Sequence, residues 1–384
     1  MKRFGNLWEQ IISKENIRLA VKRACKSTCN KTPSKTRHIK YVKKHFEQVV
    51  DDIHELLVSG KYKTSKYYVY PLYEPKLRFI YCLPFYPDRI IHHCIMNVLA
   101  PIWDKMMHTE SYACRVGYGQ HKAGTLCGQY AKKYKYVAQF DISQFYISIE
   151  HNLLKQVIRR KIKDKILLAV LDEIIDSIST RDKNIIMLRA LKKKGNTSKD
   201  VDIGLEKLLR SKAMGNKARA GLPIGNFTSQ WFGNIFMHEL DDYVKHELSV
   251  KPYIRYCDDF LIFSNNKAEL NAICAKIKDF LWNRLHLMLS KCEVYSTTQG
   301  IDFTGYRYFH NGLVLVRKRV ATKQRRTLKH LLVKLICESK MNYEFARSQL
   351  ASMWGILKWA KTYNFRQAFR FEYIFKEVTA LAAV

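Results

Sequence analysis

The chain has 384 residues, of which 47% are hydrophobic, so it is not a disordered polymer and is long enough for two or three subdomains around a sizeable core. Its 67 Lys and Arg residues against 34 Asp and Glu give a formal net charge of +33. A polyanion would relieve the self-repulsion of so basic a chain, which makes nucleic acid the obvious partner class and a ribosome-associated or simply basic protein the alternative.

The first third of the chain predicts helices followed by a hairpin. Residues 1–45 are basic and mostly helix-like, either as a solvated charged face or as an arm for nucleic acid. Residues 46–60 carry apolar residues at helical spacing and end in glycine. The aromatic and β-branched stretch 66–83 predicts a β-hairpin, and the apolar periodicity of 88–107 predicts a helix.

The middle of the chain alternates between strand and helix signals. Residues 134–149 predict a strand, a turn and the start of a helix, and residues 152–178 are expected to be helical. Residues 180–220 are polar and basic and are interpreted as an inserted, mobile segment. Residues 226–248 predict an apolar helix, and 251–264 predict a strand, a tight turn and a second strand.

The last third predicts a helix, a small sheet and a helical end. A helix is expected over 267–286, and residues 300–316 predict two short strands around the turn His310-Asn311-Gly312. The remainder is helical and basic at its start. Strands and helices mix without regular βαβ alternation, which favours the α+β class.

Cysteines and apolar segments give no sign of zinc fingers or membrane insertion. The ten cysteines follow no zinc or disulfide spacing, so we expect free thiols in a reducing cytosol. The start MKRFGNLWEQII is interrupted by polar residues, and no apolar run is long enough to span a bilayer. We therefore expect a cytoplasmic protein with no membrane partner.

Acidic residues at strand ends stand out in so basic a chain. Asp141 ends the strand VAQFD, and Asp258-Asp259 lie between PYIRY and FLIFS. Adjacent carboxylates repel each other unless a cation offsets their charge, although an Asx-type turn is the alternative. Carboxylates that hold two divalent ions are suited to an in-line displacement at phosphorus. A further pair, Asp241-Asp242 inside a helix, is interpreted as a solvated face.

Three sequence boxes in order resemble those of reverse transcriptases. Residues 256–259 (YCDD) resemble the YxDD box, 140–146 (FDISQFY) the first catalytic box, and 221–230 (GLPIGNFTSQ) the box that falls between them. The resemblance covers roughly residues 60–310. It implies an RNA-directed DNA polymerase, a nucleotidyltransferase that adds dNTPs to a DNA or cDNA primer on a template RNA. It also implies two Mg²⁺ ions as cofactors, for which Mn²⁺ can substitute.

The resemblance implies a right-hand polymerase fold with fingers, an antiparallel palm sheet and a helical thumb. Its catalytic acids would be Asp141, Asp258 and Asp259, with Asp259 as a secondary ligand because neighbouring strand residues point to opposite faces. Ile142 belongs to the implied metal-binding set. The implied divisions are a basic N-terminal extension at 1–45, fingers at 46–134, palm at 135–158, fingers and basic insertion at 159–220, palm at 221–315, and thumb at 316–384.

Further roles follow from the same resemblance. Tyr146 falls at the steric gate that excludes a 2′-hydroxyl, and a core aromatic is the alternative. The other residues implied to bind the dNTP are Lys76, Arg78, Gln230 and Lys291, of which Lys291 would protonate the pyrophosphate. Phe303, Thr304, Gly305 and Tyr306 resemble the primer grip. Residues 111–123 resemble the approach to the palm in group II intron-like enzymes, where Arg115 and Gly117 would lie near the template.

The fidelity box discriminates within the family. It comprises Ile224, Gly225, Ser229 and Gln230, and its IGxxxSQ pattern replaces the QGxxxSP of many bacterial reverse transcriptases. This pattern and the N-terminal MKRFGNLWEQI look like the enzymes of diversity-generating retroelements. Those enzymes copy a template-repeat RNA with errors opposite adenine, their cDNA replaces a variable region of a target gene, and a basic pentameric accessory variability protein assists.

Two other readings stay open. One is a phage-defence or retron-type reverse transcriptase, and the other is a catalytically idle RNA-binding protein with a polymerase-like fold, against which the three intact aspartates argue. No RNase H or endonuclease domain is evident, and no HNH-like cluster follows the expected thumb, which disfavours an intron enzyme with a C-terminal nuclease.

Overall fold

The computed structural model describes residues 3–26, 33–73, 76–193, 198–213, 218–337 and 342–382. The chain forms two compact units, each described by itself. Unit 1 comprises Met1–Thr109, Ile142–Ser249 and Lys276–Lys291, and unit 2 comprises Glu110–Asp141, Val250–Ala275 and Cys292–Val384. Among the residues described, no helix has the length and apolarity that a membrane crossing requires.

The basic N-terminal region of unit 1 is built of amphipathic helices. Its elements are α1 (Trp8–Ile12), α2 (Lys14–Lys26), α3 (Pro33–Lys44), α4 (Phe46–Val58) and, after the π-helical turn η1 (Phe85–Arg89), α5 (Ile90–Met106). Ile17, Ala20 and Val21 of α2 are fully buried, and α2 packs against α4 and α5. The lysines and arginines of α2 therefore occupy the opposite face of an anchored helix.

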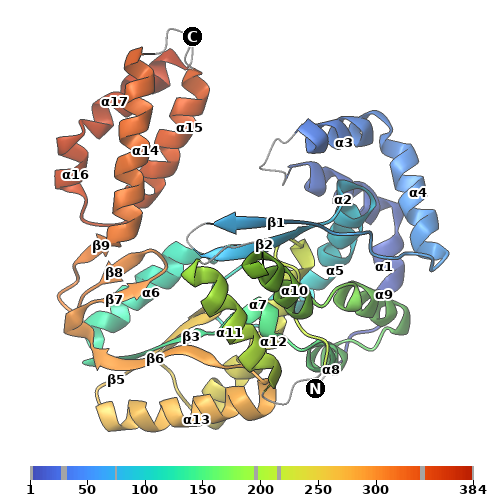
Figure 1. Cartoon of the computed structure of the whole chain (residues 1–384), viewed down its shortest axis with the longest axis horizontal. Helices are drawn as coiled ribbons and strands as arrows, with labels where there is room; N and C mark the ends of the chain where they lie inside the picture. The colour runs from blue at the N-terminus through green and yellow to red at the C-terminus, as the bar shows by residue number, and fades with distance from the viewer. Residues whose placement is uncertain are drawn as a thin grey trace. The chain divides into compact units, whose positions relative to one another are not determined.

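The predicted hairpin of unit 1 is confirmed. Strands β1 (Tyr68–Tyr73) and β2 (Leu77–Cys82) pair antiparallel (Figure 1). The polar stretch 180–220, interpreted as an inserted, mobile segment, forms two helices among its described residues, α10 (Thr180–Lys193) and α11 (Lys199–Ala213). Some of their apolar residues face inward: Leu188, Val201 and Leu208 form one buried cluster with Phe79 and Tyr81 of β2.

The remaining helices of unit 1 follow the first and third boxes. They are α7 (Phe145–Ser148), α8 (His151–Lys161), α9 (Lys165–Asp176), α12 (Phe227–Asp242) and the π-helical turn η2 (Tyr243–Glu247); α13 (Lys267–Leu285) also enters this unit. The helix expected over 152–178 is interrupted, because Asp164 caps α9 by accepting a hydrogen bond from the amide of Leu167.

Unit 2 is built around a four-stranded sheet. Its strands are β3 (Tyr136–Ile142), β4 (Tyr253–Tyr256), β5 (Asp259–Ser264) and β6 (Leu289–Ser296), in the order β4-β5-β3-β6, and β5 is antiparallel to both β3 and β4. Helix α6 (Gln120–Lys133) buries Ala123 and Cys127 against Val137, Leu261 and other residues of this sheet. Mixed helices and antiparallel sheets confirm the predicted α+β class.

A second sheet of unit 2 has three strands where two were predicted. They are β7 (Ile301–Phe303), β8 (Tyr306–Tyr308) and β9 (Val314–Val316), paired antiparallel after the 3₁₀ turn η3 (Thr297–Gln299). The extra strand arises because Thr304 and Gly305 both adopt left-handed φ angles, 46° and 92°, and so close a two-residue hairpin.

The C-terminal part of unit 2 is helical, as predicted. It contains α14 (Lys318–Cys337), α15 (Tyr343–Leu357), α16 (Tyr363–Ala368) and α17 (Phe371–Leu381) (Figure 1). Leu328, Leu350, Leu357 and Phe371 contribute to a buried core that these helices share. The boundaries expected for fingers, palm and thumb remain predictions.

Candidate active site

The three aspartates of the sequence boxes lie at one end of the β4-β5-β3 strands. Asp141 of β3 and Asp259 of β5 are register partners, so their side chains share a face of the sheet. Asp258 lies in the two-residue turn between β4 and β5, next to Asp259. Asp258 is not part of a strand, so the alternation of side chains along a strand does not apply to this pair. The role of Asp259 as a secondary ligand therefore stays a prediction.

A buried arginine holds this turn in place. Arg255 is fully buried, and its guanidinium donates hydrogen bonds to the carbonyl oxygen of Cys257 (3.0 Å) and to Oγ of Ser111 (2.8 Å). Cys257 has a left-handed φ of 56°, a conformation that costs a non-glycine residue about 1 kcal/mol and needs such support. Arg255 was not identified from the sequence, where its signal is one charged residue within the apolar strand YIRY.

The carboxylates repel one another strongly. The pKa of Asp259 is raised to about 7, first by burial and then by the negative charges of Asp141 and Asp258 and a hydrogen bond with Asp141. Arg317 opposes this shift; it also approaches Asp302 at 3.5 Å, and its amide donates to the carbonyl oxygen of Gly305. Arg317 was not singled out from the sequence. The excess negative charge makes this edge suited to binding a cation.

The raised pKa gives a prediction for the metal-free protein. Folded Asp259 keeps a proton that the unfolded chain releases above pH 3.8, so its stabilising contribution is complete below that pH and is lost as the pH rises through about 7. The loss is on the order of 4 kcal/mol, because each unit of pKa difference corresponds to about 1.4 kcal/mol. Melting temperatures of wild type and Asp259→Asn, measured without divalent ions, should diverge between about pH 4 and about pH 7, with wild type falling faster. Parallel curves would contradict this electrostatic picture.

The segment predicted to grip the primer has a buried part and an accessible part. Phe303 and Tyr306 are core residues, and the Tyr306 hydroxyl donates a hydrogen bond to the carbonyl oxygen of Ile356 (3.0 Å). Thr304 and Gly305 form the hairpin turn and are partly exposed. Contact with a nucleic acid strand would therefore come from the turn rather than from the two aromatic rings.

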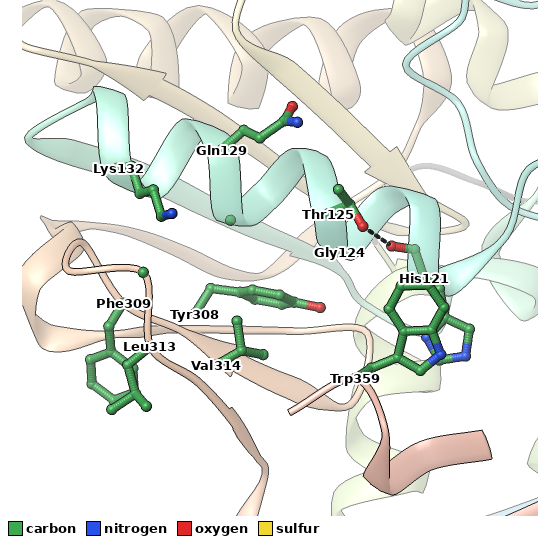
Figure 2. A pocket seen from close by; sticks show the side chains of 12 residues that line it. His121, Gly124, Thr125, Gln129, Lys132, Tyr308, Phe309, Leu313, Val314 and Trp359 are labelled. Carbon is green, nitrogen blue, oxygen red and sulfur yellow. Dashed lines mark hydrogen bonds between the residues drawn. The ribbon is translucent and has the colours of Figure 1, made fainter. Parts of the chain in front are cut away.

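Helix α6 seats the β7–β9 sheet beside a cavity of about 270 Å³. Gly124 is required there, because a Cβ at this position would collide with the Tyr308 hydroxyl. Figure 2 shows Trp359 stacked on His121 at one end of the cavity, with ring centroids 4.5 Å apart. None of the three aspartates lines this cavity, so the cavity is not the candidate active site.

The GLPIGNFTSQ segment of unit 1 is fixed to β2. Gly225 has a φ of 125°, and a Cβ there would lie 2.5 Å from the carbonyl oxygen of Tyr81. The amide of Tyr81 donates to the carbonyl oxygen of Ile224 (2.8 Å). Ser229 is buried at the start of α12, Ile224 is half-buried, and Gln230 is exposed. Gly225 and Ser229 are thus constrained by their surroundings, whereas the Gln230 side chain is exposed.

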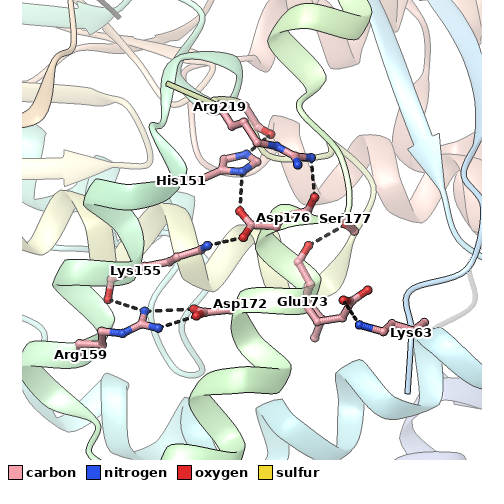
Figure 3. Close-up of polar contacts among 11 residues, drawn as sticks. Lys63, His151, Lys155, Arg159, Asp172, Glu173, Asp176, Ser177 and Arg219 are labelled. Carbon is pink, nitrogen blue, oxygen red and sulfur yellow. Dashed lines mark hydrogen bonds and ion pairs between the residues drawn. The ribbon is translucent and has the colours of Figure 1, made fainter. Parts of the chain in front are cut away.

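A polar network anchors the start of the same segment (Figure 3). His151 Nε2 lies 3.1 Å from the carbonyl oxygen of Gly221, and its Nδ1 lies 3.2 Å from the Asp176 carboxylate. Lys155 pairs with the same carboxylate, and Arg219 donates to the carbonyl oxygen of Asp176 (2.6 Å). The segment therefore enters α12 from a fixed point on α8 and α9.

The other predicted residues of unit 1 differ in accessibility. Tyr146 is half-buried in α7; its carbonyl oxygen accepts from the amide of Leu222 (2.7 Å), and a Cβ on Gly233 would lie 3.1 Å from its ring. Lys76 and Arg78 are exposed on one side of the hairpin, two residues apart.

Three other predicted positions offer less free surface. Ile142 is buried in β3, and Lys291 is half-buried in β6. In unit 2, Arg115 is also buried: its guanidinium lies 3.9 Å from the centroid of the Tyr118 ring and donates to the carbonyl oxygen of Ser111. Gly117 is exposed, and the expectation that this segment lies near a template stays a prediction.

Comparison with known proteins defines the class. Residues 73–308 of the 384 match the family described as reverse transcriptase (RNA-dependent DNA polymerase), and the chain belongs to this family. It is therefore an RNA-directed DNA polymerase, a nucleotidyltransferase whose substrates are nucleic acid and dNTPs and whose class uses divalent metal ions. The chain is also similar to protein YkfC of Escherichia coli (strain K12), with 26% identity over 344 residues and 78% of each chain covered.

Proposed function

We propose that Asp141, Asp258 and Asp259 hold two Mg²⁺ ions and that the protein extends a DNA or cDNA primer on an RNA template. The observation that carries this proposal is the carboxylate cluster across β3 and β5, where burial and the neighbouring negative charges raise the pKa of Asp259 to about 7. The ions would stabilise charge on the attacking and leaving oxygens. In this proposal β1–β2 belong to the fingers, the β4-β5-β3-β6 sheet to the palm and α14–α17 to the thumb.

We further propose that the enzyme serves a diversity-generating retroelement and makes errors opposite adenine. The support is the IGxxxSQ pattern together with its setting. Gly225 and Ser229 are constrained by close backbone approach and burial, while Ile224 and Gln230 retain accessible surface. The two positions that depart from the commoner box are thus the ones able to influence a bound base pair.

The proposed partners are a template-repeat RNA and a basic pentameric accessory protein. With a net charge of +33, this chain would repel another basic protein at long range. An RNA bound by both would neutralise that repulsion, so we propose that the template RNA joins the two proteins.

Sequencing of cDNA made by the purified protein tests the retroelement proposal. On an RNA template with all four bases equally represented, we expect substitutions opposite adenine to exceed those opposite the other bases at least about tenfold, equivalent to about 1.4 kcal/mol of lost discrimination. Ile224→Gln and Gln230→Pro, which restore the commoner box, should reduce this excess.

Gln10→Ala, a change of an exposed glutamine outside the box, is the matched control and should leave the error spectrum unchanged. Equal error rates at all template bases, from a protein that synthesises cDNA well, would reject the mutagenic role and leave the polymerase assignment intact. Such a result would favour a phage-defence or retron-type enzyme.

A further inference from the structure

Three histidines and one aspartate gather where α12 ends. His238, Asp242 and His246 follow one another at intervals of four residues, so the helix and its π-helical continuation η2 place them on one face. His108 comes from the segment that follows α5. All four residues belong to unit 1. π-helical turns within helices are frequent at functional sites.

The donor atoms of this cluster lie close together. One ligand atom each from His108, Asp242 and His246 lie within 4.8 Å of one another, and His108 Nε2 is 2.7 Å from an Asp242 oxygen. Around a four-coordinate Zn²⁺ with bonds of about 2.0–2.1 Å, neighbouring donors would be about 3.3 Å apart. Small side-chain rotations would close the difference, and His246 is exposed and free of helix packing on its outer side.

A hydrogen-bonded pair of His108 and Asp242 is the simpler explanation, but it leaves the other imidazoles unexplained. The His108 ring centroid lies 5.3 Å from that of His238 and 5.4 Å from that of His246. His238 is 3% exposed, its Nε2 is 3.6 Å from the second Asp242 oxygen, and its Nδ1 has no hydrogen-bond partner among the described residues. Imidazole nitrogens gathered around one carboxylate are a donor set typical of zinc.

We propose that His108, Asp242 and His246 bind a first-row divalent cation of the zinc class, with His238 beside the ion. The site fastens the ends of two helices that already pack along their length. His93 of α5 stacks on Phe227 of α12 with ring centroids 4.5 Å apart, and Trp103 and Phe232 follow at 6.2 Å.

The ion would therefore hold the far end of α12, the helix whose first turn contains Ser229 and Gln230. The proposed role is structural and does not depend on the proposed retroelement function. It uses residues different from the three aspartates of β3 and β5.

Metal binding to the full-length protein tests the proposal. The protein carries the Asp258→Asn substitution, so that the carboxylate cluster of β3 and β5 contributes little to metal binding. It is purified without a polyhistidine tag, and a chelator removes any bound metal. After addition of Zn²⁺ and gel filtration, elemental analysis should give about one zinc per chain, and Co²⁺ should give the strong visible absorption of a tetrahedral site with nitrogen donors. Zinc should also raise the melting temperature by a few degrees.

His246→Ala and Asp242→Asn should each lose the bound zinc and the thermal shift, whereas His330→Ala, a change of an exposed histidine on α14, should keep both. Zinc binding by the parent protein, in which the histidine cluster is intact, tests the proposal even if a variant folds poorly. Absence of zinc binding or of the Co²⁺ absorption in the parent protein, or equal binding by well-folded His246→Ala, would overturn the proposal.

Discussion

Asp141→Asn is expected to lower Mg²⁺-dependent dNTP incorporation by at least about a thousandfold while leaving RNA affinity nearly unchanged. The substitution keeps the size of the side chain but removes one of the charges that face Asp259 across the β3–β5 pairing. Loss of a metal-holding charge lowers the rate of chemistry, whereas RNA binding depends mainly on the many cations of the chain. Asp258→Ala is expected to behave in the same way.

The matched control is Asp279→Asn, which removes an exposed acid on α13 and should leave synthesis unchanged. Single-turnover primer extension and fluorescence anisotropy with labelled RNA separate the two effects. Removal of a repelling charge should leave the metal-free protein as stable as wild type or more so. A melting temperature at or above that of wild type would exclude misfolding as the cause of inactivity. Near-normal extension by Asp141→Asn would contradict the metal assignment.

Tyr146→Ala is expected to reduce discrimination against ribonucleotides by about a hundredfold, because a steric barrier to the 2′-hydroxyl would be removed. The ring is held in place from two directions in unit 1. Its backbone carbonyl accepts a hydrogen bond from Leu222, and α12 approaches the ring at Gly233 so closely that a Cβ would crowd it. A fixed ring excludes a substituent better than a mobile one.

Competition between each rNTP and its dNTP measures the discrimination as a ratio of kcat/KM values. Tyr146→Phe retains the ring and should keep most of the selectivity, so it separates steric exclusion from a role of the hydroxyl. If both Tyr146→Ala and Tyr146→Phe discriminate against ribonucleotides as well as wild type does, Tyr146 is a packing residue and the steric gate is a different residue.

Local sequence patterns predicted the elements that carry the aspartates. The apolar stretches on both sides of Asp258-Asp259 predicted a strand, a turn and a strand, and the structure has β4 and β5 at these positions. The aromatic stretch 66–83 likewise predicted the β1–β2 hairpin. Such patterns succeed because both the hydrophobic period and the turn residues are local properties of the chain.

Features that depend on distant partners could not be predicted. Arg255 acquires its role from Ser111, which is 144 residues away in the sequence, and Arg317 acquires its role from Asp259. Residues 180–220 appeared too polar for packed structure, but a few buried apolar side chains of α10 and α11 suffice because β2 supplies the opposing surface. The position of Asp258 in a turn, outside strand β5, likewise became visible only in the folded chain.

The acidic pair in α12 shows the same limit. Asp241-Asp242 was interpreted as a solvated face, but Asp241 is fully buried and Asp242 contacts His108. The interval of four residues from His238 to Asp242 and from Asp242 to His246 was visible in the sequence. His108 was the partner that only the folded chain brings to this face.

The most direct measurement is the anomalous scattering of Mn²⁺ in crystals of the protein with a template–primer duplex and a non-reactive dNTP analogue. The account predicts two Mn²⁺ peaks about 3.5–4 Å apart, bonded to carboxylate oxygens of Asp141 and of Asp258 or Asp259. A bound dNTP analogue with no metal at these carboxylates, or with Mn²⁺ only at the histidine cluster of α12, would contradict it.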